Sequence, residues 1–422
     1  MPKCKRRILV VGTTRDYVAR IREKMPGRAF FLTDPSAVSP GTLFIPPDEE
    51  LICPLADGIG VTDRLLFHLQ SEAITLSGIT CFDCEWLPLA ASLADRLGLP
   101  FPPGEAVLNC RDKFLSKKLW MENGVSCPQV RPVFALGDIL AFMREIGSPV
   151  VLKPRIGSGS ALTFRCETEA EAGLCYAEIV NGLKARADEP LFQNMVSGTP
   201  QGVLCEEWIR GDEFSCDFLV DGPQLKVLRT ARKYYSTDLP LGTALAYEIP
   251  ARLPEEVDDT AFKEQLWRAA HILGLERGLG MADFLYIKGA LRFLELTPRL
   301  GGDCLPWLIK ESCGLDMLQF ALDFSEGGSP VAPPSEGWER LIGVRIHAGR
   351  SGRLKTVRPC FREHGVTVRS QLWIRRPGDY IQMPPEDYGS WLLGHVIFQP
   401  DTSADIPAQI QDLLRAVEVD IT

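Results

Sequence analysis

Short apolar runs alternate with amphipathic stretches along the first hundred residues. Residues 7–12, RILVVG, form an apolar run ending in glycine, which predicts a buried strand. Leu87–Leu97 has apolar residues at helical spacing and is followed by Gly98 and Pro100, which predicts a helix that ends there. Such alternation is typical of a Rossmann-like α/β domain. The region contains neither GxGxxG nor GxxxxGK[ST], so it carries neither the dinucleotide fingerprint nor the P-loop fingerprint.

A helix and a strand with basic residues follow. The pattern predicts a helix over residues 111–123 that is capped by Asn109 and contains Lys113 near its start. Residues 149–154, PVVLKP, predict a strand that carries Lys153 near its end. A loop of small residues lets backbone N–H groups approach phosphate oxygens, and a lysine adds a point charge. A mobile surface hairpin and a solvated helix cation are the alternatives for these features. The small residues of the loop are Gly157, Ser158, Gly159 and Ser160.

The most informative stretch is residues 281–302, MADFLYIKGALRFLELTPRLGG, which predicts two strands around a turn centred on Gly289. Asp283 lies six residues before that glycine and Glu295 lies six after it, so the two carboxylates are expected to face each other. Thr297 shares the face of Glu295 because side chains alternate along a strand. Facing carboxylates repel unless a cation is supplied, and oxygen ligands suit Mg²⁺ or Mn²⁺. A solvated pair on an exposed face is the alternative.

Two neighbouring sequences extend this chemistry. Arg299 adds a guanidinium group, and the two glycines that follow in this segment let a ligand approach the backbone closely. Together they indicate a phosphate or carboxylate substrate. The segment CEEWIRGDE, residues 205–213, predicts a strand whose exposed backbone groups can contact an adenine edge. Glu213 lies beyond its turn, where it can accept hydrogen bonds from ribose hydroxyls.

Composition narrows the classes of protein. The 422 residues carry a net charge of −9, which argues against general nucleic-acid binding. No run of about 18 apolar residues is present, so no membrane span is expected. The 13 cysteines are scattered through the chain, as is typical of a reduced cytoplasm, and we expect a cytoplasmic protein. Cys81 and Cys84 form a CxxC without a second pair at zinc spacing, so a metal or redox role is the less favoured interpretation.

The order of these motifs resembles the ATP-grasp superfamily of carboxylate–amine ligases over about residues 109–320. The tail RLGGDCLP, residues 299–306, further resembles the branch of L-amino-acid ligases and carnosine synthases. The resemblance implies a Rossmann-like leading domain over 1–108. It also implies linker helices with a small lid subdomain over 109–206, a large subdomain with the Mg/ATP site over 207–326, and a β-rich C-terminal part over 327–422. The fold class is therefore mixed α/β and α+β, in several domains.

The resemblance also implies roles for individual residues. Lys113 and Lys153 would bind the phosphates of ATP, and Asp283, Glu295 and Thr297 would hold Mg²⁺ or Mn²⁺. Arg299 would bind the substrate carboxylate or the acyl phosphate. The family usually has asparagine where Thr297 stands, which puts a second metal site in question. The remaining nucleotide contacts would come from a flap (Gly157, Ser158, Gly159, Ser160), an adenine edge (Glu206, Glu207, Ile209), the ribose-binding Glu213 and, at the γ-phosphate, either Arg232 or Lys233.

The function that this resemblance implies is an ATP-dependent ligase that joins a carboxylate to an amine through an acyl phosphate and releases ADP and phosphate. Its partners would be small molecules, with amino acids favoured, rather than nucleic acid or a membrane, and a homodimer is compatible with it. Two alternatives stay open. One is a ligase of the same fold that acts on a carboxylate or amine other than an amino acid. The other is a nucleotide-binding regulator that has lost catalysis.

Overall fold

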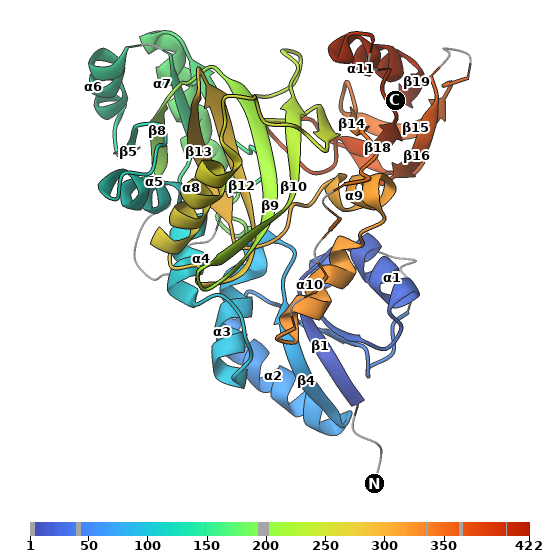
Figure 1. Cartoon of the computed structure of the whole chain (residues 1–422). Helices are drawn as coiled ribbons and strands as arrows, with labels where there is room; N and C mark the ends of the chain where they lie inside the picture. Colours follow the sequence, from blue (N-terminus) through green and yellow to red (C-terminus); the bar gives the residue numbers. More distant parts are fainter. Residues whose placement is uncertain are drawn as a thin grey trace.

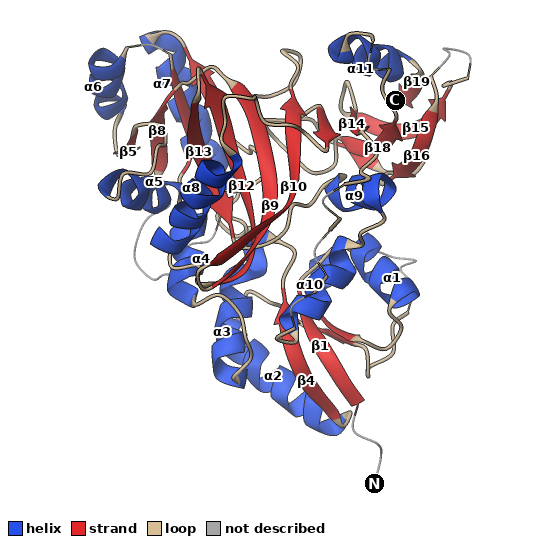
Figure 2. Cartoon of the chain, viewed as in Figure 1, coloured by secondary structure: helices blue, strands red, loops and turns tan. Residues whose placement is uncertain are grey.

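The chain forms an N-terminal α/β part and two wider lobes built on β-sheets (Figure 1). The computed structural model describes residues 5–38, 44–147, 149–192, 202–328, 330–331, 333–334, 336–362, 366–401 and 403–422. Figure 2 shows helices on the outside of the sheets in both the N-terminal part and the left-hand lobe. Within these ranges no helix is long and apolar enough to cross a membrane. The predicted mixed α/β and α+β architecture is confirmed.

The N-terminal part is a parallel sheet of order β3-β2-β1-β4. Its central strand β1 is the predicted RILVV segment, and its residues from Ile8 to Val11 are buried. The predicted helix at 87–97 is present with those bounds as α3 (Leu87–Leu97), and Gly98 ends it in the left-handed conformation. The other elements are β1 (Lys5–Val11), α1 (Arg15–Lys24), β2 (Ala29–Thr33), η1 (Pro35–Ala37), β3 (Glu50–Ile52), α2 (Gly58–Ser71), β4 (Ile74–Thr80) and η2 (Cys84–Trp86).

Two short helices replace the single helix predicted over residues 111–123. They are α4 (Gly104–Arg111) and α5 (Lys113–Glu122), and Asp112 lies between them. The predicted cap at Asn109 is wrong, because Asp112 caps α5: its side chain accepts hydrogen bonds from Phe114 N and Leu115 N. Asp112 also pairs with Arg155 at 2.6 Å. This pair fixes the start of α5, and with it Lys113, against the loop that follows the strand bearing Lys153.

The small lobe is an antiparallel sheet of order β5-β8-β6-β7 with two helices packed on it. A separate apolar core, which includes Ile139, Leu152 and Ile179, joins the helices to the sheet. Thr168 caps α7, since its hydroxyl accepts a hydrogen bond from Glu171 N. The elements are β5 (Val130–Val133), α6 (Leu136–Ile146), β6 (Val150–Pro154), β7 (Phe164–Cys166), α7 (Glu169–Ala185) and β8 (Val203–Glu207).

The large lobe is an eight-stranded sheet of order β13-β12-β9-β10-β11-β14-β18-β16. Strands from both sides of residue 326 share it, so the boundary expected there falls within one sheet rather than between two. Its strands are β9 (Asp212–Asp221), β10 (Gln224–Tyr234), β11 (Ala246–Ile249), β12 (Arg277–Ile287), β13 (Ala290–Thr297), β14 (Leu341–His347), β16 (Val368–Trp373) and β18 (Leu392–Phe398). The helices that follow its strands are α8 (Asp259–Ile272), α9 (Leu305–Cys313) and α10 (Met317–Ser325).

A fourth, smaller sheet completes the C-terminal end. Its order is β17-β15-β19, and it shares an apolar core with β14, β18 and α11. The core includes Val344, Leu393 and Leu413. Its elements are β15 (Gly352–Pro359), β17 (Tyr380–Ile381), α11 (Ile406–Arg415) and β19 (Val417–Ile421).

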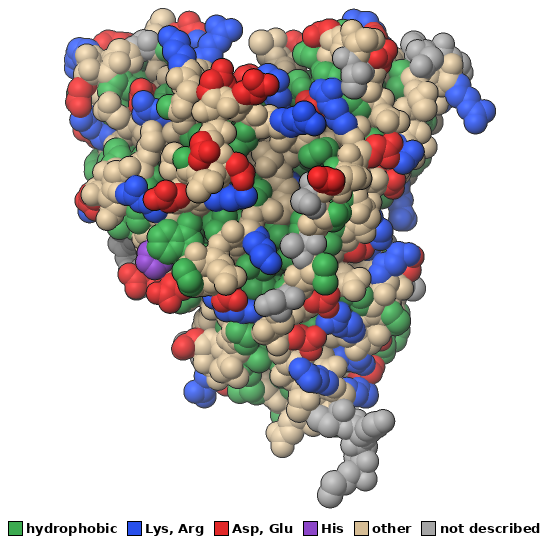
Figure 3. Space-filling view, viewed as in Figure 1, with side chains coloured by type: hydrophobic (Ala, Val, Ile, Leu, Met, Phe, Trp, Pro, Cys, Tyr) green, Lys and Arg blue, Asp and Glu red, His purple; other side chains and the backbone are tan. Residues whose placement is uncertain are grey.

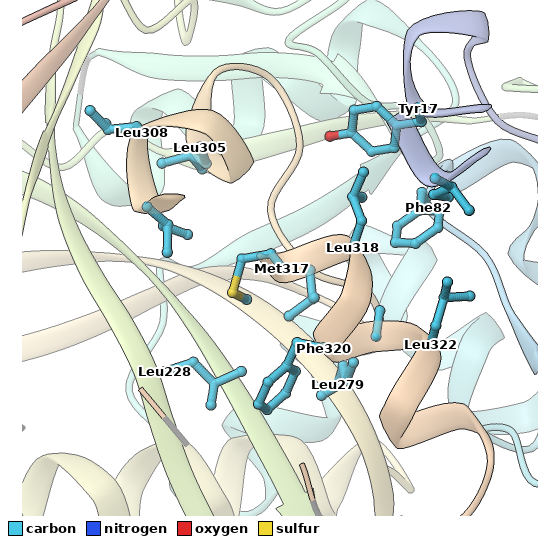
Figure 4. Close-up of a cluster of buried hydrophobic side chains, with 14 of the residues drawn as sticks. Tyr17, Phe82, Leu228, Leu279, Leu305, Leu308, Met317, Leu318, Phe320 and Leu322 are labelled. Atoms are coloured by element: carbon cyan, nitrogen blue, oxygen red, sulfur yellow. The ribbon is translucent and has the colours of Figure 1, made fainter. Parts of the chain in front are cut away.

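One apolar core runs from the N-terminal part into the large lobe. Tyr17 and Phe82 from the N-terminal part lie edge to face, with ring centroids 5.5 Å apart. They pack beside Leu318 and Leu322 of α10, and the cluster continues to Leu279 on β12 (Figure 4). Burial of such side chains stabilises the docking by roughly 1.5–3 kcal/mol each relative to exposure. The N-terminal part is therefore held firmly against the end of the large sheet where Arg299 emerges.

A fully buried ion pair lies inside the large sheet. Arg229 on β10 donates to both carboxylate oxygens of Asp217 on β9, at 2.9 and 3.0 Å, and neither side chain is exposed. Asp217 also accepts the backbone N–H of Gly301 at 2.8 Å. A Cβ at Gly301 would lie 2.6 Å from Arg229 Nη2, so only glycine fits there. The pair thereby fixes the path of the loop after Arg299.

Replacing Arg229 with methionine should destabilise the protein by about 3–5 kcal/mol, because the Asp217 carboxylate would stay buried without its cation. Urea unfolding of the wild type and the variant measures this difference. Arg415→Met is the control, since Arg415 pairs with Asp412 on the surface of α11 and such pairs contribute about 0–1 kcal/mol. Equal losses in the two variants would contradict this account.

Candidate active site

The predicted carboxylate pair forms on the hairpin of β12 and β13. Asp283 is the register partner of Glu295, as the sequence predicts. The turn is tighter than predicted, because it consists of Lys288 and Gly289 while Ala290 already pairs with Ile287. That shorter turn alone would place Asp283 opposite Leu294. A bulge at Leu294 adds one residue to β13 and restores the pairing of the two acids.

The two carboxyl groups differ in their electrostatics. Burial raises the pKa of Asp283 to about 6, with repulsion from Glu295 and Glu213 adding to it and Lys233 opposing it. Burial would also raise the pKa of Glu295, but Lys113, Lys233, Lys153 and Lys117 together hold it below its usual value. Asp283 Oδ1 is buried and has no hydrogen-bond partner among the described residues. The pair is therefore enclosed and has an oxygen available to a cation, unlike a solvated pair on an exposed face.

Lys233 rather than Arg232 lies at this pair. Its ammonium group is 2.7 Å from Asp283 Oδ2 and 2.9 Å from Glu213 Oε1. Arg232 points to the opposite side of β10 and pairs at the surface with Asp212. Neighbouring residues on a strand point to opposite faces, so Lys233 and Arg232 point in opposite directions. The sequence alone does not show which face of β10 is inward, so it does not decide between the two residues.

Lys113 and Lys153 come to the same region from different elements. Lys153, on β6, lies 2.9 Å from Glu206 Oε2. Lys113, at the start of α5, donates to Gly157 O at 2.7 Å and so touches the Gly/Ser loop. In the part of the chain described, no carboxylate lies within ion-pair distance of Lys113. Burial lowers the pKa of the Lys113 ammonium, and Lys153 and Arg111 lower it further against the attraction of Glu295.

Sequence reasoning missed Lys117, which is completely buried. Its ammonium group lies 3.0 Å from Glu206 Oε2 and donates to Leu294 O, the carbonyl of the bulge, at 2.6 Å. Lys117 thus joins the small sheet to the hairpin. The available signal was its spacing: it lies four residues after Lys113 and therefore on the same helical face.

The residues predicted to bind adenine and ribose have different surroundings. The carboxylate of Glu206 faces inward on β8 and is held by Lys117 and Lys153, so it orders the lysines. Glu207, the next residue, is only partly buried and its carboxylate accepts from Gln129 N. Ile209 lies in the loop after β8, and Glu213 is tied to Lys233.

Arg299 lies where the large sheet meets the N-terminal part. Its Nε is 3.1 Å from Cys84 Sγ, and its Nη1 donates to Leu300 O at 2.7 Å. Cys81 and Cys84 are both thiols, so the CxxC does not form a disulfide. Thr297 ends β13 beside Met281, and its carbonyl accepts from Arg299 N. Among the described residues, the second terminal nitrogen of Arg299 makes no hydrogen bond, so it is available to an anion.

A second polar cluster, which sequence reasoning did not identify, lies beyond the glycines. We call Asp303, Arg345, His347 and His395 the Asp303 cluster. Arg345 Nε is 2.8 Å from Asp303 Oδ2, and His395 Nε2 is 3.4 Å from Asp303 Oδ1. The arginine and histidines come from β14 and β18, which pair at Arg345 and His395. No signal in the sequence joins residues so far apart.

Charges on the surface are mixed in sign. Figure 3 shows basic and acidic side chains interspersed on the face in view, without one dominant basic patch. Among the described residues, no group of three or more His, Cys, Asp or Glu side chains is arranged to hold a metal ion. Two carboxylates remain sufficient for Mg²⁺ where substrate phosphates complete its ligands.

Comparison with known proteins agrees with this geometry. Residues 146–307 match the ATP-grasp domain family. The chain is 24% identical over 266 residues to the D-alanine–D-alanine ligase of Cupriavidus metallidurans, covering 58% of this chain and 73% of that protein. It is 24% identical over 279 residues to human carnosine synthase 1, covering 64% of this chain but only 33% of that protein. The crystal structure of an L-amino acid ligase from Bacillus licheniformis superposes over all of both chains, with a TM-score of 0.80 and 20% identity.

The fold and these matches agree on one domain family. The chain has an ATP-grasp fold, the match to the ATP-grasp domain family lies within it, and the relatives that it resembles are named as ligases and a synthase. Its matches to D-alanine–D-alanine ligases cover 73% of the protein from Cupriavidus metallidurans and 55% of the one from Delftia acidovorans.

The burial of His347 in the Asp303 cluster predicts how the stability of the protein changes with pH. Burial lowers the pKa of His347 to about 3, with Arg345 adding to the effect and Asp303 opposing it. The unfolded chain takes up this proton below about pH 6.5 and the folded chain does not, so stability is lost as pH falls from about 6.5 toward 3.

His347→Gln should therefore lose less stability than the wild type between pH 7.5 and pH 5, by up to about 2 kcal/mol. Urea unfolding of both proteins at the two pH values measures the difference. His271→Gln, at an exposed position on α8, is the reference for losing a histidine open to solvent. Parallel losses in the wild type and His347→Gln would contradict the prediction.

Proposed function

We propose that the protein is an ATP-dependent carboxylate–amine ligase that forms an amide through an acyl phosphate and releases ADP and phosphate. The observation that carries this proposal is the facing pair of Asp283 and Glu295 with four lysines around it. Those lysines come from α5, β6 and β10, so elements of both sheets converge on one point. Such convergence suits a polyanionic nucleotide held between two lobes.

Lys113 and Lys153 are proposed to bind the phosphates of ATP. Lys113 has no carboxylate partner among the described residues and is positioned by the Gly157 carbonyl, so its charge is available to an anion. Lys153 and Lys117 both contact Glu206, which orders the two lysines. The group keeps a net positive charge, because it contains two lysines and one carboxylate. Lys233 rather than Arg232 is proposed to contact the γ-phosphate, because Lys233 alone reaches Asp283.

A divalent cation fits beside the phosphates. Asp283 and Glu295 offer only oxygen ligands, and the buried Asp283 Oδ1 has no partner among the described residues. Mg²⁺ or Mn²⁺ would be held by these two side chains, with Thr297 next along the same face of β13. The metal neutralises phosphate charge during in-line transfer when it is bound. Lys233 holds the other oxygen of Asp283 and so orients the carboxylate.

The Gly/Ser loop is proposed to close over the phosphates. Gly157, Ser158, Gly159 and Ser160 follow β6 directly, and Gly159 and Ser160 both have positive φ angles, of 62° and 60°. Such a backbone turns successive N–H groups toward one side, which suits an anion. Closure would also exclude water from the reactive acyl phosphate.

The remaining contacts follow from the same geometry. Glu207 and Ile209 are proposed to line the adenine through backbone atoms beside Glu206, and Glu213 to hold the ribose. Arg299 is proposed to bind the carboxylate that becomes the acyl group. That carboxylate oxygen attacks the γ-phosphorus, and an amine then attacks the acyl carbon and displaces phosphate.

Amino acids are the proposed substrates. D-alanine–D-alanine ligase, carnosine synthase 1 and L-amino acid ligase are all named for amino-acid substrates or products. We also propose domain boundaries at residues 108 and 206, with the nucleotide between the domains on either side of residue 206, and a cytoplasmic location. Small molecules rather than nucleic acid or a membrane are the proposed partners, and a homodimer stays a prediction.

Phosphate release from Mg·ATP, assayed over a panel of single and paired amino acids, tests the proposal. We expect release that requires two amino acids together. Glu295→Gln should lower the rate by at least about 100-fold, because the loss of partners one shell further from a metal already costs 10–100-fold. Glu264→Gln makes the same chemical change on the exposed face of α8 and should leave the rate within twofold of the wild type.

Two results would count against it. Full activity in Glu295→Gln would overturn the metal assignment. Binding of ATP without ADP release from any carboxylate and amine would favour the nucleotide-binding regulator instead. Release that needs a carboxylate or amine other than an amino acid would keep the ligase and replace its substrates.

A further inference from the structure

No residue of the Asp303 cluster has a role in the proposed nucleotide site. The cluster begins at the far end of the loop that starts with Arg299, so the two features are separated by three residues only. A Cβ at Gly302 would lie 3.6 Å from Arg299 Nη1 and 3.9 Å from the Tyr17 hydroxyl, which shows how closely the loop passes these groups. A guanidinium for the acyl group therefore lies at one end of the loop and a carboxylate at the other.

Polar atoms in this cluster lack partners although they are buried. His395 is only 4% exposed, and its Nδ1 has no hydrogen-bond partner among the described residues. Asp303 Oδ1 is likewise without a hydrogen bond there, since its contact with His395 Nε2 is 3.4 Å. Buried polar groups in folded proteins are normally satisfied, so the unpaired Nδ1 indicates a site for a donor.

The backbone at Asp303 is also strained. Its φ is +63°, a conformation that residues other than glycine rarely adopt. Such conformations are found mainly at functional sites.

The charges of the cluster define what it can bind. The Arg345 guanidinium, with both histidines, holds the pKa of Asp303 below its usual value against the effect of burial, so the group is a carboxylate. Burial lowers the pKa of His395, with Arg345 adding to this effect and Asp303 and Asp16 opposing it, so the ring is neutral. Asp303 beside Nε2 favours a proton on that nitrogen, which makes Nδ1 an acceptor.

We propose that His395 and Asp303 form part of the amine subsite of the ligase: His395 Nδ1 takes a proton from the ammonium group of the second substrate, and Asp303 orients the ring from its Nε2 side. This inference rests on the proposed ligase function. The ammonium ion gives one proton to His395, and its nitrogen forms the new bond to the acyl carbon. The bond from that carbon to the phosphate oxygen breaks, and the second amine proton leaves with the hydrogen phosphate. Asp303 stabilises the imidazolium ion that results.

Hydroxylamine separates the two halves of this reaction. It is a small nucleophile, uncharged at neutral pH, and it converts an acyl phosphate to a hydroxamate without an ammonium subsite or a base. The experiment measures amide formation with the amine substrate and hydroxamate formation with hydroxylamine, for the wild type, His395→Gln and Asp303→Asn. Both replacements keep the size and hydrogen-bonding capacity of the side chain, and thermal unfolding checks that both variants fold.

We expect the ratio of amide to hydroxamate to fall at least about 100-fold in His395→Gln, the lower end of what a positioned general base contributes. Asp303→Asn should lower the same ratio without raising the KM for ATP, because it removes the charge that stabilises the imidazolium ion. His271→Gln, the same change on exposed α8, should leave the ratio as in the wild type.

The opposite results overturn the subsite. An unchanged ratio in both variants, or an equal loss of amide and hydroxamate, would make the cluster structural. A wild-type protein that forms no hydroxamate with any carboxylate would contradict the ligase function itself, which is a different failure from an unchanged ratio.

Discussion

The structure depends on a buried network in which lysines and carboxylates from one helix and five strands neutralise one another. Lys117 and Lys153 share Glu206, and Lys233 bridges Glu213 and Asp283. Unpaired charges of this kind would cost several kcal/mol each to bury, so the segments that carry them must stay together. The same network leaves Lys113 without a carboxylate partner in the described chain and one oxygen of Asp283 without a hydrogen bond. Stability and readiness for a charged ligand therefore come from the same contacts.

Two structural details fix the positions of Glu295 and of the loop after Arg299. The bulge at Leu294 brings Glu295 opposite Asp283, and its carbonyl is fixed by Lys117 of α5. The buried pair of Arg229 and Asp217 fixes the loop after Arg299 through the N–H of Gly301. The strand that carries Glu295 and the loop that carries Arg299 are therefore positioned by charged side chains that lie outside the proposed substrate contacts.

The C-terminal strands contribute to the centre of the molecule. Because β14 and β18 continue the large sheet, Arg345 and His395 reach Asp303 at the end of the arginine loop. A small change of sequence in these strands would therefore alter the chemistry near Arg299 without touching the nucleotide contacts. This arrangement offers a way for one fold to accept different amines.

The sequence by itself determined the local features. Period-two and helical spacing located β1, α3 and the hairpin, and the order of motifs indicated the ATP-grasp class, because these signals depend on neighbours along the chain. It misplaced the cap at Asn109, since a cap depends on where the helix actually starts. Only the tertiary structure separated Lys233 from Arg232, revealed Lys117, and joined Asp303 to His395. Those outcomes depend on which face of a strand is buried and on contacts between residues far apart in the chain, neither of which local spacing specifies.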